Sequence, residues 1–282
     1  MELIEKIALM RELSEKWRGD GDIISLVPTM GFLHEGHMEL LRVGREKGDR
    51  VIMSIFVNPT QFGPQEDYSR YPRDTEGDLR KARSAGVDAV FMPTVEEMYP
   101  EGFQSTVRVE GITRYLCGGS RPGHFAGVTT VVAKLFNITK PHLAIFGEKD
   151  YQQLGVIKQM VRDLNMDIEI IGVPTVRQRD GLAVSSRTSY LSSEERSSAL
   201  SLKKGLDLAR AMVAEGEKEP AKIINAVRQL ILSHPFTEID YITICDPEKL
   251  TDIEIIDRPC LVALAVKVGK ARLIDNVMVR EN

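Results

Sequence analysis

Two histidines three residues apart are the first residues of the chain with an evident chemical use. They lie in residues 28–37, with the sequence PTMGFLHEGH, between an apolar run and an amphipathic pattern. If this segment opens a helix, unpaired backbone N–H groups and the positive end of the helix dipole favour phosphate there. The imidazoles of His34 and His37 can also donate hydrogen bonds to phosphate oxygens. We therefore predict a nucleotide site in this segment.

Other interpretations of the two histidines remain open at this point. Two surface histidines near a turn would give the same pattern. A zinc site is disfavoured because the metalloprotease signature H-E-x-x-H places its histidines four residues apart, and here the spacing is three. The chain contains no G-x-x-x-x-G-K-[ST] loop and no G-x-G-x-x-G fingerprint, so a kinase-like P-loop and an ordinary dinucleotide fold both lose support.

Two further polar segments could bind parts of a ligand. Residues 58–63, NPTQFG, follow an apolar run, and the amide of Gln61 suits a ligand with hydroxyl and carboxylate groups, although a plain turn is the alternative. Residues 185–189, SSRTS, form a hydroxyl-rich segment with one permanent cation, Arg187. This segment resembles a phosphate clamp, and a solvated linker is the alternative.

Residues 146–153, FGEKDYQQ, place a cation beside polar side chains at the end of another apolar run. Lys149 could neutralise phosphate charge. Asp150 could accept hydrogen bonds from ribose hydroxyls or simply cap a helix. Gln153 could hold an acid substrate. The segment therefore extends the predicted nucleotide site.

Two more segments have weaker indications. Residues 121–127, RPGHFAG, look like another glycine-flanked helix start. Helix capping explains the acidic cluster Asp74, Glu76 and Asp78, but one of these carboxylates could contact Mg²⁺, which takes only one or two protein carboxylates beside nucleotide phosphates.

Short apolar runs alternate with helical patterns through the first ~175 residues. One helical pattern covers 127–137, where apolar residues recur at i, i+3, i+4, i+7 and i+8. The alternation predicts parallel βαβ units in an open α/β sheet, which binds ligands beyond the carboxyl ends of its strands. The expected strands are Ile23–Val27, Val51–Val57, Asp88–Met92, Leu143–Phe146 and Ile168–Val173.

The pattern changes after Pro174. A polar stretch leads into Ser192 and Glu195, which have the spacing of a capping box. Two helical patterns and the expected strands Ile239–Cys245 and Leu261–Val268 follow, which indicates a small α+β unit. We predict two domains, residues 1–176 and residues 177–282, with the Ser-Ser-Arg loop near the start of the second.

The bulk composition bounds the class of protein. A length of 282 residues fits two domains. The formal charge of −4, with both signs interleaved, disfavours nucleic-acid binding. No apolar stretch approaches the ~20 residues of a membrane span, and the N-terminus does not resemble a secretory signal. Three widely separated cysteines fit a reducing cytosol, so we expect a cytoplasmic protein without a membrane partner.

Taken in order, residues 28–37, 58–63, 121–127, 146–153 and 185–188 resemble the signature segments of the pantothenate synthetase family. The resemblance implies a Rossmann-like nucleotide- and pantoate-binding domain, a smaller C-terminal domain and a homodimer. It also implies a reaction: pantoate attacks the α-phosphate of Mg²⁺-bound ATP, pyrophosphate leaves, and β-alanine attacks the pantoyl adenylate to give pantothenate and AMP. The family belongs to the nucleotidyltransferases with an H-x-G-H segment.

The resemblance assigns a role to each matching position. It implies ATP contacts for Pro28, Thr29, Met30, Gly31, His34, His37, Phe146, Gly147, Lys149, Asp150, Val176, Val184, Ser185, Ser186 and Arg187. Those with a catalytic role would be His34, His37, Lys149, Ser185, Ser186 and Arg187. The positions for pantoate and β-alanine would be Met30, Asn58, Gln61 and Gln153. Asp78 would contact Mg²⁺, although its neighbour Gly77 leaves the acidic cluster thinner than in some relatives. Thr188 stands where Asn is common.

Two other functions remain possible from the sequence. A nucleotidyltransferase acting on a phosphate-bearing acceptor would keep the two histidines but would need more basic residues around that acceptor. A non-catalytic nucleotide-binding module would not need Lys149 and Arg187 in addition to both histidines. Exchange of pyrophosphate into ATP that depends on pantoate separates these alternatives from the ligase.

Overall fold

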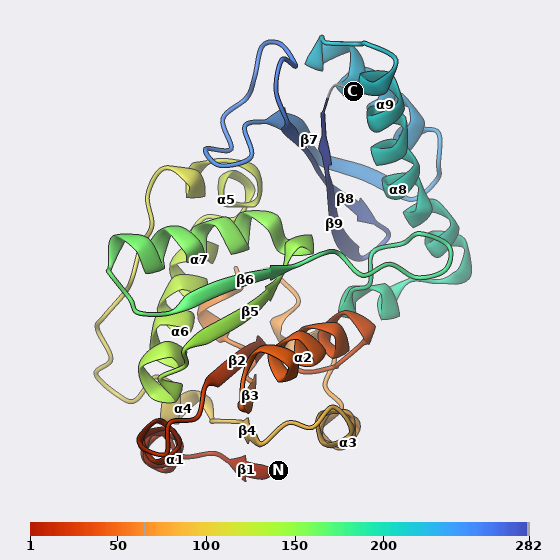
Figure 1. Ribbon diagram of the computed structural model, residues 1–282. Coiled ribbons are helices and arrows are strands. Elements are labelled where there is room, and N and C mark those ends of the chain that lie inside the picture. Colours follow the sequence, from red (N-terminus) through yellow and green to blue (C-terminus); the bar gives the residue numbers. More distant parts are fainter. Residues whose placement is uncertain (65, 281–282) are drawn as a thin grey trace. The chain divides into compact units, whose positions relative to one another are not determined.

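Six parallel strands form the larger sheet of the computed structural model, which describes residues 1–64 and 66–280 (Figure 1). The strands are β1 (Glu2–Ile4), β2 (Ile24–Thr29), β3 (Arg50–Ile55), β4 (Ala89–Phe91), β5 (Leu143–Gly147) and β6 (Glu169–Val173). Their order in the sheet is β1-β4-β3-β2-β5-β6. The prediction of an open parallel sheet is confirmed, and β1 is the strand it missed. With three residues, of which only Ile4 is buried, β1 has no detectable period.

Helices cover both faces of this sheet. Leu41 of α2 and Ala82 of α3 belong to the apolar cluster on the face that includes Val27 of β2. Because side chains alternate along a strand, Ile24 and Leu26 point to the opposite face, and α1 and α6 both contact β2. The helices in this part of the chain are α1 (Ile7–Gly19), α2 (Glu35–Lys47), α3 (Thr75–Ser84), α4 (Val95–Met98), α6 (His124–Thr139) and α7 (Tyr151–Asp163), whereas α5 (Leu116–Ser120) belongs to the second unit, described below.

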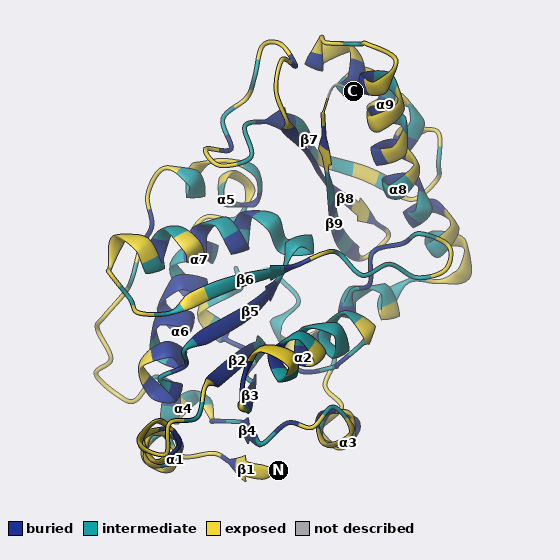
Figure 2. Cartoon of the chain, viewed as in Figure 1, coloured by how far each residue is buried: buried dark blue, intermediate teal, exposed yellow. Residues whose placement is uncertain are grey.

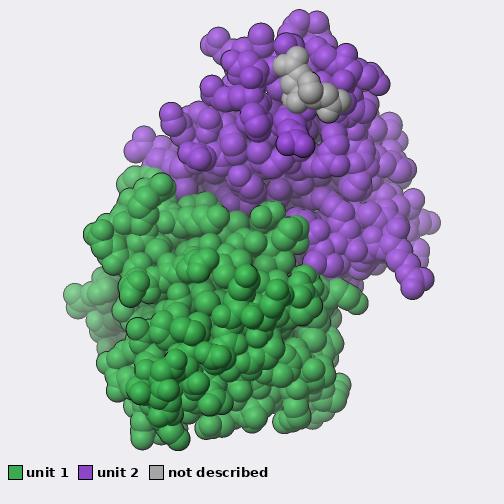
Figure 3. Space-filling model, viewed as in Figure 1, with its two compact units in different colours: residues 1–110, 121–148, 153–174 green, residues 111–120, 149–152, 175–282 purple. Residues whose placement is uncertain are grey.

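The chain divides into two units, which Figure 3 colours separately. Unit 1 contains residues 1–110, 121–148 and 153–174, and unit 2 contains residues 111–120, 149–152 and 175–282. The main boundary lies after Pro174, two residues before the predicted one at 176. The two short segments that join unit 2 were not predicted. They belong together because the side-chain amide of Gln152 donates hydrogen bonds to the carbonyl groups of Ile112 and Tyr115, at 2.8 and 2.7 Å.

Unit 2 contains two long helices and an antiparallel sheet of three strands. The elements are α8 (Ser193–Ala214), α9 (Pro220–Leu232), β7 (Thr237–Cys245), β8 (Cys260–Val268) and β9 (Ala271–Val279). The predicted capping box starts α8: the Ser192 side chain accepts the Glu195 N–H, and the Glu195 carboxylate accepts the Ser192 N–H. Strand β9 was missed because Asp275 and Asn276 interrupt its apolar alternation.

Burial follows these layers (Figure 2). The central strands β2 and β3 are buried almost throughout, as are β8 and one side of α8 and α9. The helices α8 and α9 approach closely at Gly205, where an added Cβ would lie 2.9 Å from Val227 Cγ1. None of the helices in the described part of the chain combines the length and the apolar character required to cross a membrane.

Candidate functional site

The strand order of unit 1 creates the point at which such sheets bind ligands. From β2 the chain proceeds to β3 and β4 on one side of the sheet, and β5 and β6 lie on the other side. Strand β2 pairs in parallel with both β3 and β5, so the carboxyl ends of these three strands are neighbours. Ligands of open α/β sheets bind at this position, where the strand order reverses. The residues after Thr29, Ile55 and Gly147 therefore share one edge.

The turn after β2 has a specific backbone shape that α3 maintains. Gly31 and Phe32 both have positive φ angles, 78° and 51°, and such a conformation is uncommon for a residue with a side chain. The Asp78 carboxylate accepts the N–H groups of Phe32 and Leu33, each at 2.7 Å, and the Lys81 ammonium donates to the Leu33 carbonyl at 2.6 Å. Two residues of one helix therefore fix the turn that precedes the histidines.

Asp78 itself is almost completely enclosed, with 1% of its surface exposed. Burial raises the pKa of its carboxyl above the ordinary value, although the two N–H groups and Lys81 act in the opposite direction. Each of its two oxygens accepts one backbone N–H, and the predicted Mg²⁺ contact of Asp78 stays a prediction. Its contacts give it the role of shaping the turn.

His34 and His37 lie together at the N-terminus of α2, as the sequence predicts. Their rings stack with centroids 4.0 Å apart and an interplanar angle of 25°. The Nδ1 atom of His37 accepts the backbone N–H of His34 at 3.3 Å. A neutral His37 with an accepting Nδ1 carries its proton on Nε2, which can then donate to an anion. The helix start therefore combines dipole, N–H groups and an imidazole donor.

The segment after β3 brings two of the predicted acid-binding residues together. The Gln61 amide nitrogen lies 3.3 Å from the Met30 sulfur, and its amide oxygen accepts Asn58 Nδ2 at 3.1 Å. Asn58 is 1% exposed and also bonds to Gly127 and Tyr99. The predicted substrate contact of Asn58 stays a prediction, and its observed contacts hold Gln61 in place.

The segment 121–127 supports the same turn from α6, a role that sequence reasoning did not assign. The Gln61 carbonyl accepts His124 Nδ1 at 2.8 Å and Arg121 Nη2 at 3.3 Å. Arg121 also forms two bonds of 2.7 and 2.6 Å with the Glu66 carboxylate. At Gly127, an added Cβ would lie 2.3 Å from the Thr60 carbonyl oxygen. These contacts explain why a glycine and two basic residues stand at this helix start.

In unit 2, the predicted phosphate cation Lys149 follows β5 by two residues. Its side chain is 20% exposed, and its ammonium lies 3.7 Å from an Asp150 carboxylate oxygen, which is a loose pair. The Lys149 carbonyl accepts the side-chain amide of Asn276 at 3.0 Å. The backbone of Lys149 is therefore held, and its ammonium makes no close ion pair with Asp150.

The predicted phosphate loop follows a short turn. The Val184 N–H donates to the Val176 carbonyl at 3.0 Å, so these two residues close the base of the turn. Ser185 then caps the short helix Ser186–Tyr190, because its hydroxyl accepts the Arg187 N–H at 3.3 Å. The Thr188 hydroxyl donates to the Ser185 carbonyl at 2.6 Å. Thr188 therefore stabilises the loop at the position where Asn is common.

The remaining predicted residues lie in the elements expected for them. Phe146 and Gly147 end β5, and Gln153 lies in the first turn of α7. Pro28 and Thr29 end β2, where the Thr29 hydroxyl donates to the Ser54 carbonyl at 2.7 Å. Their ligand contacts stay predictions.

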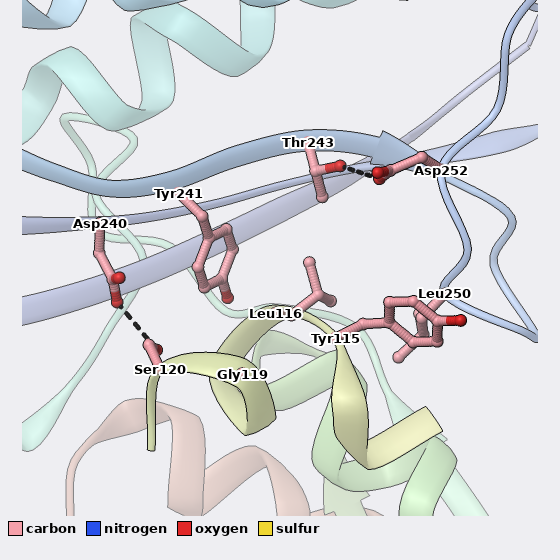
Figure 4. A pocket seen from close by; sticks show the side chains of 9 residues that line it. All are labelled: Tyr115, Leu116, Gly119, Ser120, Asp240, Tyr241, Thr243, Leu250 and Asp252. Carbon is pink, nitrogen blue, oxygen red and sulfur yellow. Dashed lines mark hydrogen bonds between the residues drawn. The ribbon is translucent and has the colours of Figure 1, made fainter. Parts of the chain in front are cut away.

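Unit 2 contains a cavity of about 310 Å³ (Figure 4). Figure 4 shows Ser120 bonded to Asp240 and Thr243 bonded to Asp252 beside it. None of the residues predicted to bind ATP or pantoate lines this cavity. Within residues 1–64 and 66–280, no group of three or more His, Cys, Asp and Glu side chains is arranged to hold a metal ion.

Comparisons with known proteins show what this chain is similar to. The chain is 57% identical over 282 residues to the pantothenate synthetase of Moorella thermoacetica, and the match covers 100% of both sequences. A crystal structure of pantothenate synthetase from Thermus thermophilus has a TM-score of 0.94 and 45% identity, covering 99% of this chain and 100% of that one.

A second solved structure, at 35% identity and a TM-score of 0.83, is pantoate-beta-alanine ligase from Francisella tularensis, described as complexed with Beta-gamma ATP and Beta-alanine. The match covers 99% of this chain and 97% of the Francisella tularensis chain. The profile of the family described as Pantoate-beta-alanine ligase matches residues 2–278. The chain therefore belongs to the pantoate-beta-alanine ligase family.

Proposed function

We propose that this protein joins pantoate to β-alanine at the expense of ATP, through a pantoyl adenylate and with release of pyrophosphate and AMP. One observation carries the proposal beyond family membership. At the carboxyl edge of one sheet, the phosphate-type helix start with His34 and His37 neighbours the contact between Met30 and Gln61. Acyl adenylation requires a carboxylate beside an α-phosphate, and this edge offers suitable groups for both.

The proposed phosphate contacts would carry most of the catalysis. Attack of the pantoate carboxylate builds negative charge on the α-phosphate and on the departing pyrophosphate. Fixed N–H donors and cations around those oxygens lower the barrier without a covalent enzyme intermediate. We assign this role to His34, His37, Lys149, Arg187 and the hydroxyls at 185–186, with Val176, Val184 and Asp150 toward ribose or adenine.

The proposed pantoate contacts use neutral groups. Gln61 can donate and accept, which suits a substrate with hydroxyl and carboxylate groups. Gln61 cannot turn freely. Asn58 donates to its side-chain amide oxygen, and Arg121 and His124 donate to its backbone carbonyl. A second amide, Gln153, would complete the contacts. An acceptor that carries phosphate would require cations instead, which disfavours the nucleotidyltransferase alternative.

Mg²⁺ is proposed to enter as part of the ATP substrate. Asp78 is enclosed and bonded to the turn, so the proposal does not depend on a direct contact between its carboxylate and the metal. Mg²⁺ usually keeps several waters and takes much of its coordination from nucleotide phosphates. The residues of this chain then act on the phosphate oxygens that remain.

The family resemblance also leads us to propose a cytoplasmic homodimer. All three cysteines are buried and unbridged, as expected for a reducing compartment. Sedimentation equilibrium of the purified chain tests the assembly, and a mass of one chain at micromolar concentration would contradict the dimer.

One assay tests the proposed reaction in two stages. Labelled pyrophosphate should exchange into ATP only when pantoate is present, and AMP should then accumulate only after β-alanine is added. Exchange without pantoate would favour the nucleotidyltransferase, and ATP binding without exchange would favour the non-catalytic module. Either result would contradict the proposal.

A further inference from the structure

Two adjacent polar residues in the middle of β9 face opposite sides of the smaller sheet. Successive side chains of a strand alternate between its faces. Asp275 lies opposite Leu264, which belongs to the apolar cluster formed with α8 and α9. Asn276 lies opposite Ala263, which belongs to the cluster that includes Tyr151. The same short piece of strand therefore reaches chain segments on both faces.

On one face, the buried Asp275 forms an ion pair with the partly buried Arg177. The two guanidinium nitrogens Nη1 and Nη2 lie 2.7 and 2.8 Å from its two carboxylate oxygens, and Asp275 is 3% exposed. The carboxylate also accepts the N–H of Asn276 at 2.8 Å. A two-bond contact of this kind fixes orientation as well as distance.

Arg177 begins the turn that leads to the predicted phosphate loop. Its Nη1 also donates to the Gly181 carbonyl at 3.1 Å, across the turn. Backbone bonds close the turn from Gln178 to Leu182 at 2.8 Å and from Val184 to Val176 at 3.0 Å. The residue after Val184 is Ser185, so Asp275 fixes the point from which the phosphate loop starts.

On the other face, Asn276 holds the backbone of Lys149. Its side-chain amide donates to the Lys149 carbonyl at 3.0 Å. Lys149 lies in the short helix Glu148–Asp150, and its side chain has several rotatable bonds. Fixing its backbone limits the positions that the ammonium can reach.

We propose that Asp275 and Asn276 are positioning residues for adenylate formation, one holding the start of the phosphate loop and the other holding Lys149. The inference rests on the proposed function, in which both segments bind ATP phosphates. Catalysis by fixed charges depends on their placement before the reaction, so residues that support them matter without touching substrate.

The variants must separate positioning from folding. Asp275→Leu alone leaves the partly buried Arg177 guanidinium without its carboxylate partner, which can destabilise the fold. The double variant Arg177→Met/Asp275→Leu removes both charges and keeps apolar volume, a change that proteins often tolerate. Asn276→Leu removes the side-chain amide that donates to the Lys149 carbonyl. Asp240→Asn is the control. Asp240 of β7 forms an ion pair with Arg272 of β9, in which Nη2 lies 2.6 Å from a carboxylate oxygen, and the substitution removes that charge.

We expect single-turnover adenylation to fall on the order of tenfold to a hundredfold in the double variant and in Asn276→Leu. The KM for ATP should rise, whereas the KM for pantoate should stay within about twofold. Asp240→Asn should adenylate at the wild-type rate.

Wild-type rates of adenylation in both variants would overturn the inference. A lower rate in the double variant that is due only to its lower melting temperature, and that disappears when the wild-type melting temperature is restored, would overturn it as well. An equal rise of both KM values would also overturn it, because that indicates a general distortion. If the unaltered chain shows no exchange that depends on pantoate, the proposed function fails, and this inference fails with it.

Discussion

At the scale of single residues, charge placement distinguishes the groups proposed to bind ligand from the groups that hold the fold. Lys149 has a loose contact with Asp150 at 3.7 Å and partial exposure. Arg121, by contrast, is tied to Glu66 by two short bonds. A cation without a tight partner can approach a phosphate at little cost, whereas a paired one must first break its ion pair.

Replacing Lys149 with Ala should therefore slow adenylate formation without disturbing the fold. Loss of one contact that stabilises developing charge commonly costs about 3 kcal/mol, or roughly a hundredfold in rate. Single-turnover adenylation by rapid quench measures the change. Lys158→Ala, at an exposed position of the following helix α7, is the matched control and should react normally. Wild-type rates in Lys149→Ala would exclude the assigned role.

The pair between Glu66 and Arg121 predicts a dependence of stability on pH. Burial acts to raise the pKa of Glu66, but the hydrogen bonds and charge of Arg121 outweigh it, so the pKa lies below the ordinary 4.5. A lowered pKa contributes stability above the unfolded value and loses it as pH falls through the folded value.

Glu66→Gln should reduce the free energy of unfolding by about 1–2 kcal/mol at pH 7. The difference from the wild type should shrink as the pH falls below about 4.5. Urea unfolding at several pH values measures both. A difference that stays constant however far the pH is lowered would show that the carboxylate charge is not responsible.

At the scale of elements, α3 determines the shape of the turn that leads into α2. Phe32 in this turn has a positive φ of 51°, which is uncommon for a residue with a side chain. The Asp78 carboxylate accepts the N–H groups of Phe32 and Leu33, and the Lys81 ammonium donates to the Leu33 carbonyl. The position of His34 and His37 thus depends on a helix that begins some forty residues later.

Asp78→Asn should destabilise this turn. The amide keeps the size of the side chain but offers one acceptor oxygen, and its NH₂ group faces a backbone N–H. We expect a loss of about 1–3 kcal/mol in the free energy of unfolding and slower adenylation. Glu76→Gln is the control, because the Glu76 side chain is 93% exposed in the same helix. Equal effects of the two substitutions would contradict the role of Asp78.

At the scale of the whole molecule, ligand binding should stabilise the chain against heat. A ligand at about 100 times its dissociation constant adds about 2.7 kcal/mol to the free energy of unfolding. Differential scanning fluorimetry with Mg²⁺ and ATP should therefore show a rise of several degrees in the wild type, and a smaller rise in Lys149→Ala. A rise of equal size in both would indicate that Lys149 does not contact the nucleotide.

The division into two units was only partly predictable from sequence. The sequence pattern changes after Pro174, and the last segment of unit 2 begins at the next residue. No sequence pattern shows that residues 111–120 and 149–152 belong to unit 2. Their place there depends on hydrogen bonds from Gln152 to carbonyl groups about forty residues away. Local composition does not encode partners of that kind.

The sequence by itself indicated the parallel sheet, all of its strands except β1, and the motifs that follow those strands. Apolar period and turn chemistry specify these features within a few residues of each position. Only the tertiary structure decided that Asp78 is enclosed beneath a turn, that Arg121 and His124 hold Gln61, and that β9 ties Lys149 and Arg177 to one strand. Those contacts join distant segments, so they exist only after the chain has folded and the core has fixed which side chains can meet.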